Sequence, residues 1–224
     1  MRGLVIAIEG IDGSGKHTIS MRLQEKLNNA EVISFPRHQE EFSGDLVDRF
    51  LYDGLRFSDN EYKAVREGML YAIDRMVALG RIRENGKSKL DELEEGKNLI
   101  FDRYLSSNFI HRCNNMSVEE LKLYITKMKH VEFHLMGLPE PDITFVLSVK
   151  PEVSYRNIIK RGRQLDDNET IENLTDSYNK LQCLCDLEGY KLIECCKEVD
   201  GEYEMLTVDE ILEKVVEVLR DKFC

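Results

Sequence analysis

A short glycine-rich segment near the N-terminus constrains the fold more than any other part of the sequence. Gly10 and Gly15 flank four residues and Lys16 follows, after the apolar run of residues 4–8 and before a stretch with helical spacing. Glycines let backbone N–H groups turn toward one point, and a helix N-terminus favours an anion there. The segment predicts a strand–loop–helix unit that binds phosphate groups. Its predicted binding residues are Gly10, Asp12, Gly13, Ser14, Gly15, Lys16, His17 and Thr18.

The residue after Lys16 departs from the usual pattern of such loops. A Ser or Thr is expected there because its hydroxyl ligates Mg²⁺, but His17 occupies the position and Thr18 follows. Mg²⁺ prefers oxygen ligands, so a neutral imidazole is a poor ligand for it. We therefore expect a metal ion at this loop to be coordinated by phosphates, by waters and by a carboxylate from elsewhere in the chain.

Apolar runs alternate with helix-like stretches along the chain, which predicts an α/β fold with a parallel sheet. The expected strands are short and apolar throughout, as in strands covered on both faces. They lie at residues 3–9, 31–35, 98–102, 143–149 and 190–195. Helices are expected at residues 16–28, 60–83 (capped by Ser58), 151–160, 170–187 and 208–221, and another begins at the Ser117–Glu120 capping pair.

Two polar, charged segments interrupt this alternation. Residues 84–96 are interpreted as a surface excursion between a helix and the third strand. Residues 161–169 have two interpretations, a mobile flap or a solvated turn, and composition alone favours the turn because most charge runs are solvated.

Composition limits the class of protein. A length of 224 residues suits a single domain, and 42% hydrophobic residues suffice for a sizeable core. A net charge of −11 argues against broad electrostatic binding of nucleic acid. The apolar runs are too short to span a membrane, and the six cysteines lack metal-finger spacing. We expect a soluble, cytoplasmic protein with reduced thiols.

A second candidate group stands at the end of the third expected strand, where Asp102 and Arg103 follow one another. Ligands of open α/β sheets lie outside the carboxyl ends of the strands. A carboxylate there holds a metal-bound water, and an arginine clamps a phosphate with two hydrogen bonds. The alternative is a structural Asp–Arg pair, but the nearby phosphate loop favours the site.

Two further groups carry less weight on their own. Arg37 follows Pro36 after the second expected strand, and either reaches an anion or stands on the surface. Tyr71 and Arg75 are four residues apart and share one helix face. Tyrosine at such spacing more often packs in a core than stacks on a base.

Taken together, these residues resemble the thymidylate kinases, within the nucleoside monophosphate kinase group of P-loop proteins. The resemblance implies one domain over residues 1–224 with a three-layer fold of the P-loop NTPase type. A five-stranded parallel sheet would carry helices on both faces and a short lid at about residues 161–169. The matching motifs are Glu9-Gly10-Ile11-Asp12-Gly13-Ser14-Gly15-Lys16, Phe35-Pro36-Arg37, Tyr71 with Arg75, Asp102-Arg103-Tyr104 with Ser107-Asn108, Leu138-Pro139-Glu140-Pro141-Asp142, and Pro151-Glu152 with Lys160-Arg161-Gly162-Arg163.

The resemblance also implies roles for these positions. Asp12 would accept a hydrogen bond from the 3′-hydroxyl of a deoxynucleotide, and Arg37 and Arg103 would hold its phosphate. Tyr71 would stack on thymine and Arg75 would read the edge of the base. The implied substrate-binding residues are Asp12, Phe35, Pro36, Arg37, Tyr71, Arg75, Arg103, Tyr104, Ser107 and Asn108.

A catalytic basic residue is placed differently among the members of this family. Some carry an arginine just after the loop Asp, where this chain has Gly13. The resemblance therefore assigns the charge to the lid, and Asp102 would place Mg²⁺ through water. The implied catalytic residues are Lys16, Asp102, Arg103, Arg161 and Arg163.

The implied activity is transfer of the γ-phosphate of ATP to dTMP, giving dTDP in dTTP synthesis. The implied cofactors are ATP and Mg²⁺, in a homodimer with no nucleic-acid or membrane partner. One alternative is a kinase for another acceptor, such as dUMP, dGMP or a deoxynucleoside. The other, which His17 motivates, is a P-loop nucleotide-binding protein without kinase activity.

Overall fold

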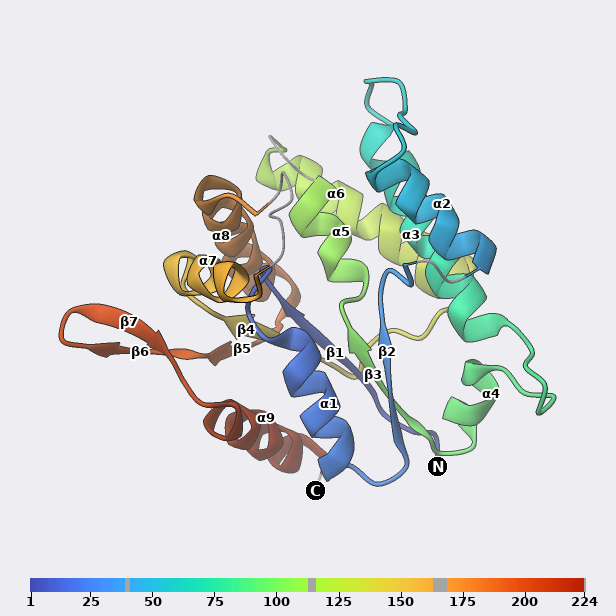
Figure 1. Ribbon diagram of the computed structural model, residues 1–224. Coiled ribbons are helices and arrows are strands. Elements are labelled where there is room, and N and C mark those ends of the chain that lie inside the picture. Colours follow the sequence, from blue (N-terminus) through green and yellow to red (C-terminus); the bar gives the residue numbers. More distant parts are fainter. Residues whose placement is uncertain (39–40, 113–115, 163–168, 224) are drawn as a thin grey trace.

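Five parallel strands form the central sheet, in the order β2-β3-β1-β4-β5 (Figure 1). The computed structural model describes residues 1–38, 41–112, 116–162 and 169–223. The strands are β1 (Val5–Gly10), β2 (Ala30–Ser34), β3 (Asn98–Asp102), β4 (Ile143–Ser148) and β5 (Lys191–Glu194). All five strands expected from the sequence are confirmed, with bounds shifted by one or two residues at most.

Helices cover both faces of the sheet, because successive residues of its buried strands point into different cores. Val5 and Ala7 belong to one hydrophobic cluster, and Ile6 and Ile8 belong to the other. The second cluster is completed by α1 (Lys16–Lys26) and α9 (Val208–Phe223). The first is completed by α3 (Lys63–Gly80), α5 (Leu105–Arg112), α6 (Val118–Lys129) and α8 (Ile171–Glu188), and α7 (Pro151–Lys160) contributes to both. The expected three-layer α/β fold is confirmed.

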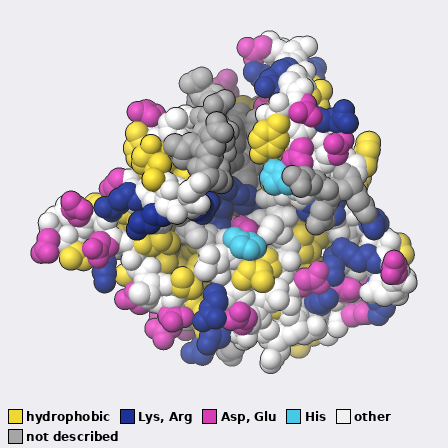
Figure 2. All heavy atoms as spheres, in the orientation of Figure 1, with side chains coloured by type: hydrophobic (Ala, Val, Ile, Leu, Met, Phe, Trp, Pro, Cys, Tyr) yellow, Lys and Arg dark blue, Asp and Glu magenta, His cyan; other side chains and the backbone are white. Residues whose placement is uncertain are grey.

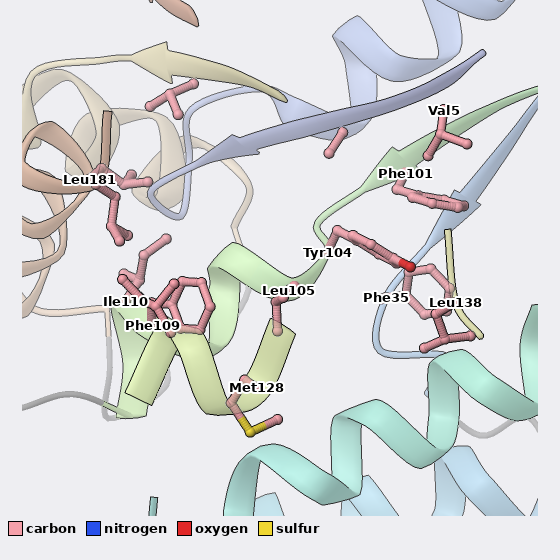
Figure 3. Close-up of a cluster of buried hydrophobic side chains, with 14 of the residues drawn as sticks. Val5, Phe35, Phe101, Tyr104, Leu105, Phe109, Ile110, Met128, Leu138 and Leu181 are labelled. Carbon is pink, nitrogen blue, oxygen red and sulfur yellow. The ribbon is translucent and has the colours of Figure 1, made fainter. Parts of the chain in front are cut away.

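An aromatic group lies in the first cluster, beneath the carboxyl ends of β2 and β3 (Figure 3). Tyr104 stacks on Phe101 with 4.4 Å between ring centres, and Phe35 meets Phe101 edge-on at 5.7 Å. Removing one buried Phe ring from such a core costs about 3–5 kcal/mol. The turns that follow β2 and β3 are therefore anchored to a rigid base.

The helix assignments needed several corrections. The helix expected at residues 60–83 spans only Lys63–Gly80 and follows Tyr62, so Ser58 is not its cap. Residues 84–96 are more than a surface excursion, because they contain α4 (Lys89–Glu94), which opens with a Ser88–Asp91 capping box. The Ser117–Glu120 capping pair is confirmed. The elements that sequence patterns did not reveal are α2 (Glu41–Leu51), α5, the π-helical turn η1 (His130–Leu135), and the antiparallel hairpin of β6 (Cys196–Val199) and β7 (Glu202–Met205).

Most of the described helices bury one side and expose the other, whereas Leu105–Ile110 of α5 have no exposed residue. None of them has both the length and the apolar composition that a membrane crossing requires. Cys195, which follows β5, has no exposed surface. Burial raises the pKa of its thiol to about 12, so the thiol stays protonated near neutral pH.

Candidate active site

The glycine-rich loop connects β1 to α1 and lies against α7. Gly13 has a φ of +80°, and a Cβ atom built on it would lie 2.5 Å from the carbonyl oxygen of Ser154. The position therefore requires glycine for both its conformation and the close approach of α7. Ser154 Oγ donates to the carbonyl of Asp12, and Asn157 Nδ2 donates to the carbonyl of Gly13 at 3.1 Å. These α7 contacts hold the loop in place, although sequence patterns did not single out Ser154 or Asn157.

Lys16 is buried at the start of α1. Its Nζ donates to the carbonyl oxygens of Gly10 and Ile11 at 2.8 and 2.7 Å. Burial, together with the charge of Arg103, lowers the pKa of Lys16 to about 8. A bound polyphosphate would reverse this effect, since anions near an ammonium group favour its charged form.

A buried carboxylate connects the loop-bearing strand to the turn after β3. Glu9 has no exposed surface, and it accepts hydrogen bonds of 2.8 Å from Tyr104 N and from Ser107 Oγ. Burial raises the pKa of Glu9, and these two hydrogen bonds oppose the rise. Glu9 stands in one of the matching sequence motifs, but no role was predicted for it. Nothing in the sequence around Glu9 indicated that its carboxylate would be inaccessible to water.

Arg103 lies between these parts of the site. Its φ of +67° is unusual for a residue with a side chain, and its N–H donates to the carbonyl of Ile8 at 3.1 Å. Its guanidinium forms an ion pair with Asp12 of the loop. The two predicted residues, which are 91 positions apart, therefore meet as one unit.

Asp102 ends β3 beside the start of α1, and its carboxylate is largely buried. One of its oxygens, Oδ2, accepts from Ser34 Oγ at 3.2 Å and lies 3.1 Å from His17 Nδ1. His17 is therefore next to the carboxylate predicted to place the metal, whereas Thr18 is exposed. Among the residues that the structure describes, no three His, Cys, Asp or Glu side chains gather to hold a metal ion by themselves.

Arg37 follows β2 and is held by an acidic partner from α3. Its Nε and Nη2 donate to Asp74 Oδ1 at 3.1 and 3.0 Å, and its backbone N–H donates to Asp74 Oδ2 at 2.9 Å. Nη2 also donates to Ser43 Oγ at 2.9 Å. The predicted anion-binding arginine is thus oriented by Asp74, which has no exposed surface and which sequence patterns did not identify.

The residues predicted to bind the base or the nucleotide are only partly brought together. Tyr104 does not present its ring to the site, because the ring is buried in the core and its hydroxyl donates to the carbonyl of Pro139 at 3.1 Å. Phe35 and Asn108 are also buried. Tyr71 packs edge-on against Phe50 of α2, with 6.4 Å between ring centres. The guanidinium of Arg75 is buried against Glu132.

Figure 2 shows Lys and Arg side chains gathered in a hollow at the centre of the displayed face, beside a histidine. Arg161, one of the predicted catalytic residues, follows α7 and is exposed. Arg163 and the rest of the predicted lid up to residue 168 lie outside the described residues.

The sequence of this chain is similar to those of known proteins. The sequence profile of the thymidylate kinase family matches residues 8–199. A probable thymidylate kinase of Methanosarcina barkeri is 29% identical to the chain, over 98% of either protein. A thymidylate kinase of Mycoplasmoides gallisepticum is also 29% identical, over 92% of either protein.

Solved structures share the fold. A thymidylate kinase from Candida albicans superposes with a TM-score of 0.65 and 20% identity, covering 98% of this chain and 92% of that protein. A deoxyadenosine kinase from M. mycoides with bound dATP superposes with a TM-score of 0.56 and 22% identity, covering 97% of this chain and 99% of that protein. At these identities the likeness establishes the fold alone.

The pKa of Lys16 leads to a test of the loop. ADP should bind best when Lys16 is charged, so its affinity should stay level below about pH 8. Above that, the affinity should fall by up to about tenfold per pH unit. Calorimetric titration with ADP between about pH 7 and 9.5 measures this dependence. A Lys16→Arg variant, whose charge persists, should lack the decline, and an equal affinity of the native protein at both extremes would contradict the assignment.

Proposed function

The chain belongs to the thymidylate kinase family, and on that premise we propose that it transfers the γ-phosphate of ATP to dTMP, giving dTDP. The ion pair between Arg103 and Asp12 carries the proposal, because it joins an arginine suited to an acceptor phosphate to the loop suited to the donor phosphates. Phosphoryl transfer depends chiefly on placing the two groups in line and neutralising their charge.

Two arginines are suited to the acceptor phosphate. Arg103 and Arg37 each present a planar guanidinium, whose donors match the geometry of phosphate oxygens. Asp12 and Asp74 fix their orientation before substrate binds. The phosphate of dTMP is already ionised near neutral pH, so the reaction needs no strong general base. We further propose that the carboxylate of Asp12 accepts a hydrogen bond from the 3′-hydroxyl of the nucleotide, as the family resemblance implies.

The donor side combines the loop with a metal ion. Lys16 and the loop N–H groups are suited to the β- and γ-phosphates of ATP. Asp102 fits Mg²⁺ through bound water because its carboxylate offers the oxygen chemistry that this ion prefers, whereas the imidazole of His17 does not. When bound, Mg²⁺ would neutralise charge on the β- and γ-phosphates.

The remaining assignments also rest on the family resemblance. Tyr71, Ser107 and Asn108 are proposed to line the base pocket. Arg161 or Arg163 is proposed to supply positive charge to the transferred phosphoryl group. A homodimer in the cytoplasm is proposed on the same basis.

An acceptor assay tests the function. With ATP and Mg²⁺, dTMP should be phosphorylated more efficiently than dUMP, dGMP or thymidine. Arg103→Met should lower kcat/KM for dTMP by about 100-fold or more, because a partly buried, charge-assisted contact to phosphate is lost. The matched control, Arg22→Met, changes an arginine of an exposed ion pair on α1 and should act like the native enzyme. Turnover of another acceptor but not of dTMP would contradict the proposal, as would tight ATP binding without turnover of any acceptor.

His17 leads to a separate prediction about the metal. A His17→Thr variant restores the hydroxyl that phosphate loops usually supply, so the Mg²⁺ concentration for half-maximal activity should fall by about tenfold. Electron paramagnetic resonance of Mn²⁺ with ADP should show the same tightening without turnover. Met21→Thr on α1 serves as the control. An unchanged metal requirement would mean that the ion is held without any contribution from this position.

A further inference from the structure

The histidine that replaces the usual hydroxyl of the phosphate loop is held by a carboxylate. Nδ1 of His17 lies 3.1 Å from Oδ2 of Asp102, and the same oxygen accepts a hydrogen bond from Ser34 Oγ at 3.2 Å. An ionised carboxylate only accepts hydrogen bonds, so the hydrogen of the neutral imidazole is on Nδ1 and the free lone pair is on Nε2. The contact with Asp102 therefore fixes which nitrogen of His17 can bind a cation.

The two members of this pair differ in their access to solvent. The side chain of Asp102 is 11% exposed, whereas that of His17 is 70% exposed. Within the part of the chain that the structure describes, Nε2 of His17 makes no hydrogen bond to the protein. Histidine ligands of metal ions are held in the same way, because a carboxylate on the second ring nitrogen orients the ring and makes the ligating nitrogen more basic.

His17 also stands where the donor phosphates are proposed to bind. It is the second residue of α1 and directly follows Lys16. The first N–H groups of a helix have no partner within the helix, which suits this end of α1 to phosphate oxygens. In phosphate loops, the side chain after the lysine is the one that contacts the metal ion of the nucleotide. The chemistry of this side chain therefore influences which ion the site prefers.

An imidazole and a hydroxyl favour different ions. Oxygen ligands suit Mg²⁺ and Mn²⁺, whereas imidazole suits ions such as Zn²⁺ and Ni²⁺. No metal-binding group of three His, Cys, Asp or Glu side chains is found among the described residues. The nucleotide phosphates and water must therefore supply the other ligands, so an ion ligated by His17 would bind as part of a nucleotide complex.

We propose that Nε2 of His17 directly ligates the cation of the donor nucleotide, and that the site thereby favours nucleotide complexes of imidazole-preferring ions of the Zn²⁺ and Ni²⁺ class. Asp102 is the positioning residue that presents Nε2. This inference rests on the proposed function for the place of the donor phosphates, and it adds a metal preference. Mg²⁺ still uses the site through oxygen ligands, so the activity proposed above does not require the imidazole.

Two other roles of His17 make different predictions. An imidazole that only packs on Asp102 would not change the preference between metal ions. An imidazole that donates to a phosphate oxygen would, once removed, weaken the complexes of all ions alike. The decisive readout is therefore the ratio of Ni²⁺–ADP to Mg²⁺–ADP affinity, measured by calorimetry. This ratio needs neither turnover nor an acceptor, so its failure is distinct from a failure of the kinase assay.

His17→Thr tests the proposal at an exposed position. The ratio of Ni²⁺–ADP to Mg²⁺–ADP affinity should fall by about tenfold or more, because Ni²⁺ loses a nitrogen ligand and Mg²⁺ gains a hydroxyl. Retained binding of Mg²⁺–ADP shows that the variant is folded. His134→Thr, which removes an exposed histidine of η1, is the matched control and should keep the native ratio.

Nuclear magnetic resonance of the Ni²⁺–ADP complex tests the ligation itself. The paramagnetic ion should move the signal of one imidazole N–H hydrogen, that of Nδ1 in His17, far outside the ordinary range. This signal should persist in His134→Thr and be absent from His17→Thr. The proposal is overturned if the native protein shows no such signal, or if His17→Thr keeps the native ratio of the two affinities.

Discussion

The buried carboxylate of Glu9 is the contact on which the rest of the site depends. A carboxylate removed from water is costly unless its oxygens are hydrogen-bonded. One oxygen of Glu9 accepts a bond from Tyr104 in the turn after β3, and the other accepts a bond from Ser107 in the first part of α5. The strand that carries the glycine-rich loop is therefore tied to the segment that carries Arg103. Because the buried acceptors would be left unsatisfied by any shift between the two, the loop and Arg103 keep one relative position.

The same principle explains how an acidic chain forms an anion-binding site. With a net charge of −11, the surface as a whole repels nucleotides, so the site depends on a few cations placed in advance. Each of the central arginines has a carboxylate partner that fixes its direction and satisfies part of its donors. This arrangement reduces the reorganisation needed when phosphate binds. The pairs are Asp12 with Arg103, Asp74 with Arg37, and Glu132 with Arg75.

Most of the fold was predictable because it follows from local patterns. The apolar runs gave all five strands of the sheet, and Pro151 at the first position of α7 and the Ser117–Glu120 pair marked helix starts correctly. The short helices α4 and α5 and the π-helical turn were missed because each has too few residues to show a periodicity. The hairpin β6–β7 was missed because its residues are mostly exposed and polar.

The site was predictable only where its residues stand in recognisable motifs, as the acidic residues Asp12 and Asp102 also do. Lys16, Arg37 and Arg103 stand in recognisable motifs, whereas Asp74 and Glu132 are acidic residues among many, and only the folded chain brings Glu132 to an arginine 57 positions away. The central claim, that the donor loop and the acceptor arginine form one continuous site, is tested most directly by calorimetric binding of adenosine and thymidine joined through five phosphates. One site predicts that this compound binds about 100-fold or more tightly than ADP. An affinity no greater than that of ADP would contradict it.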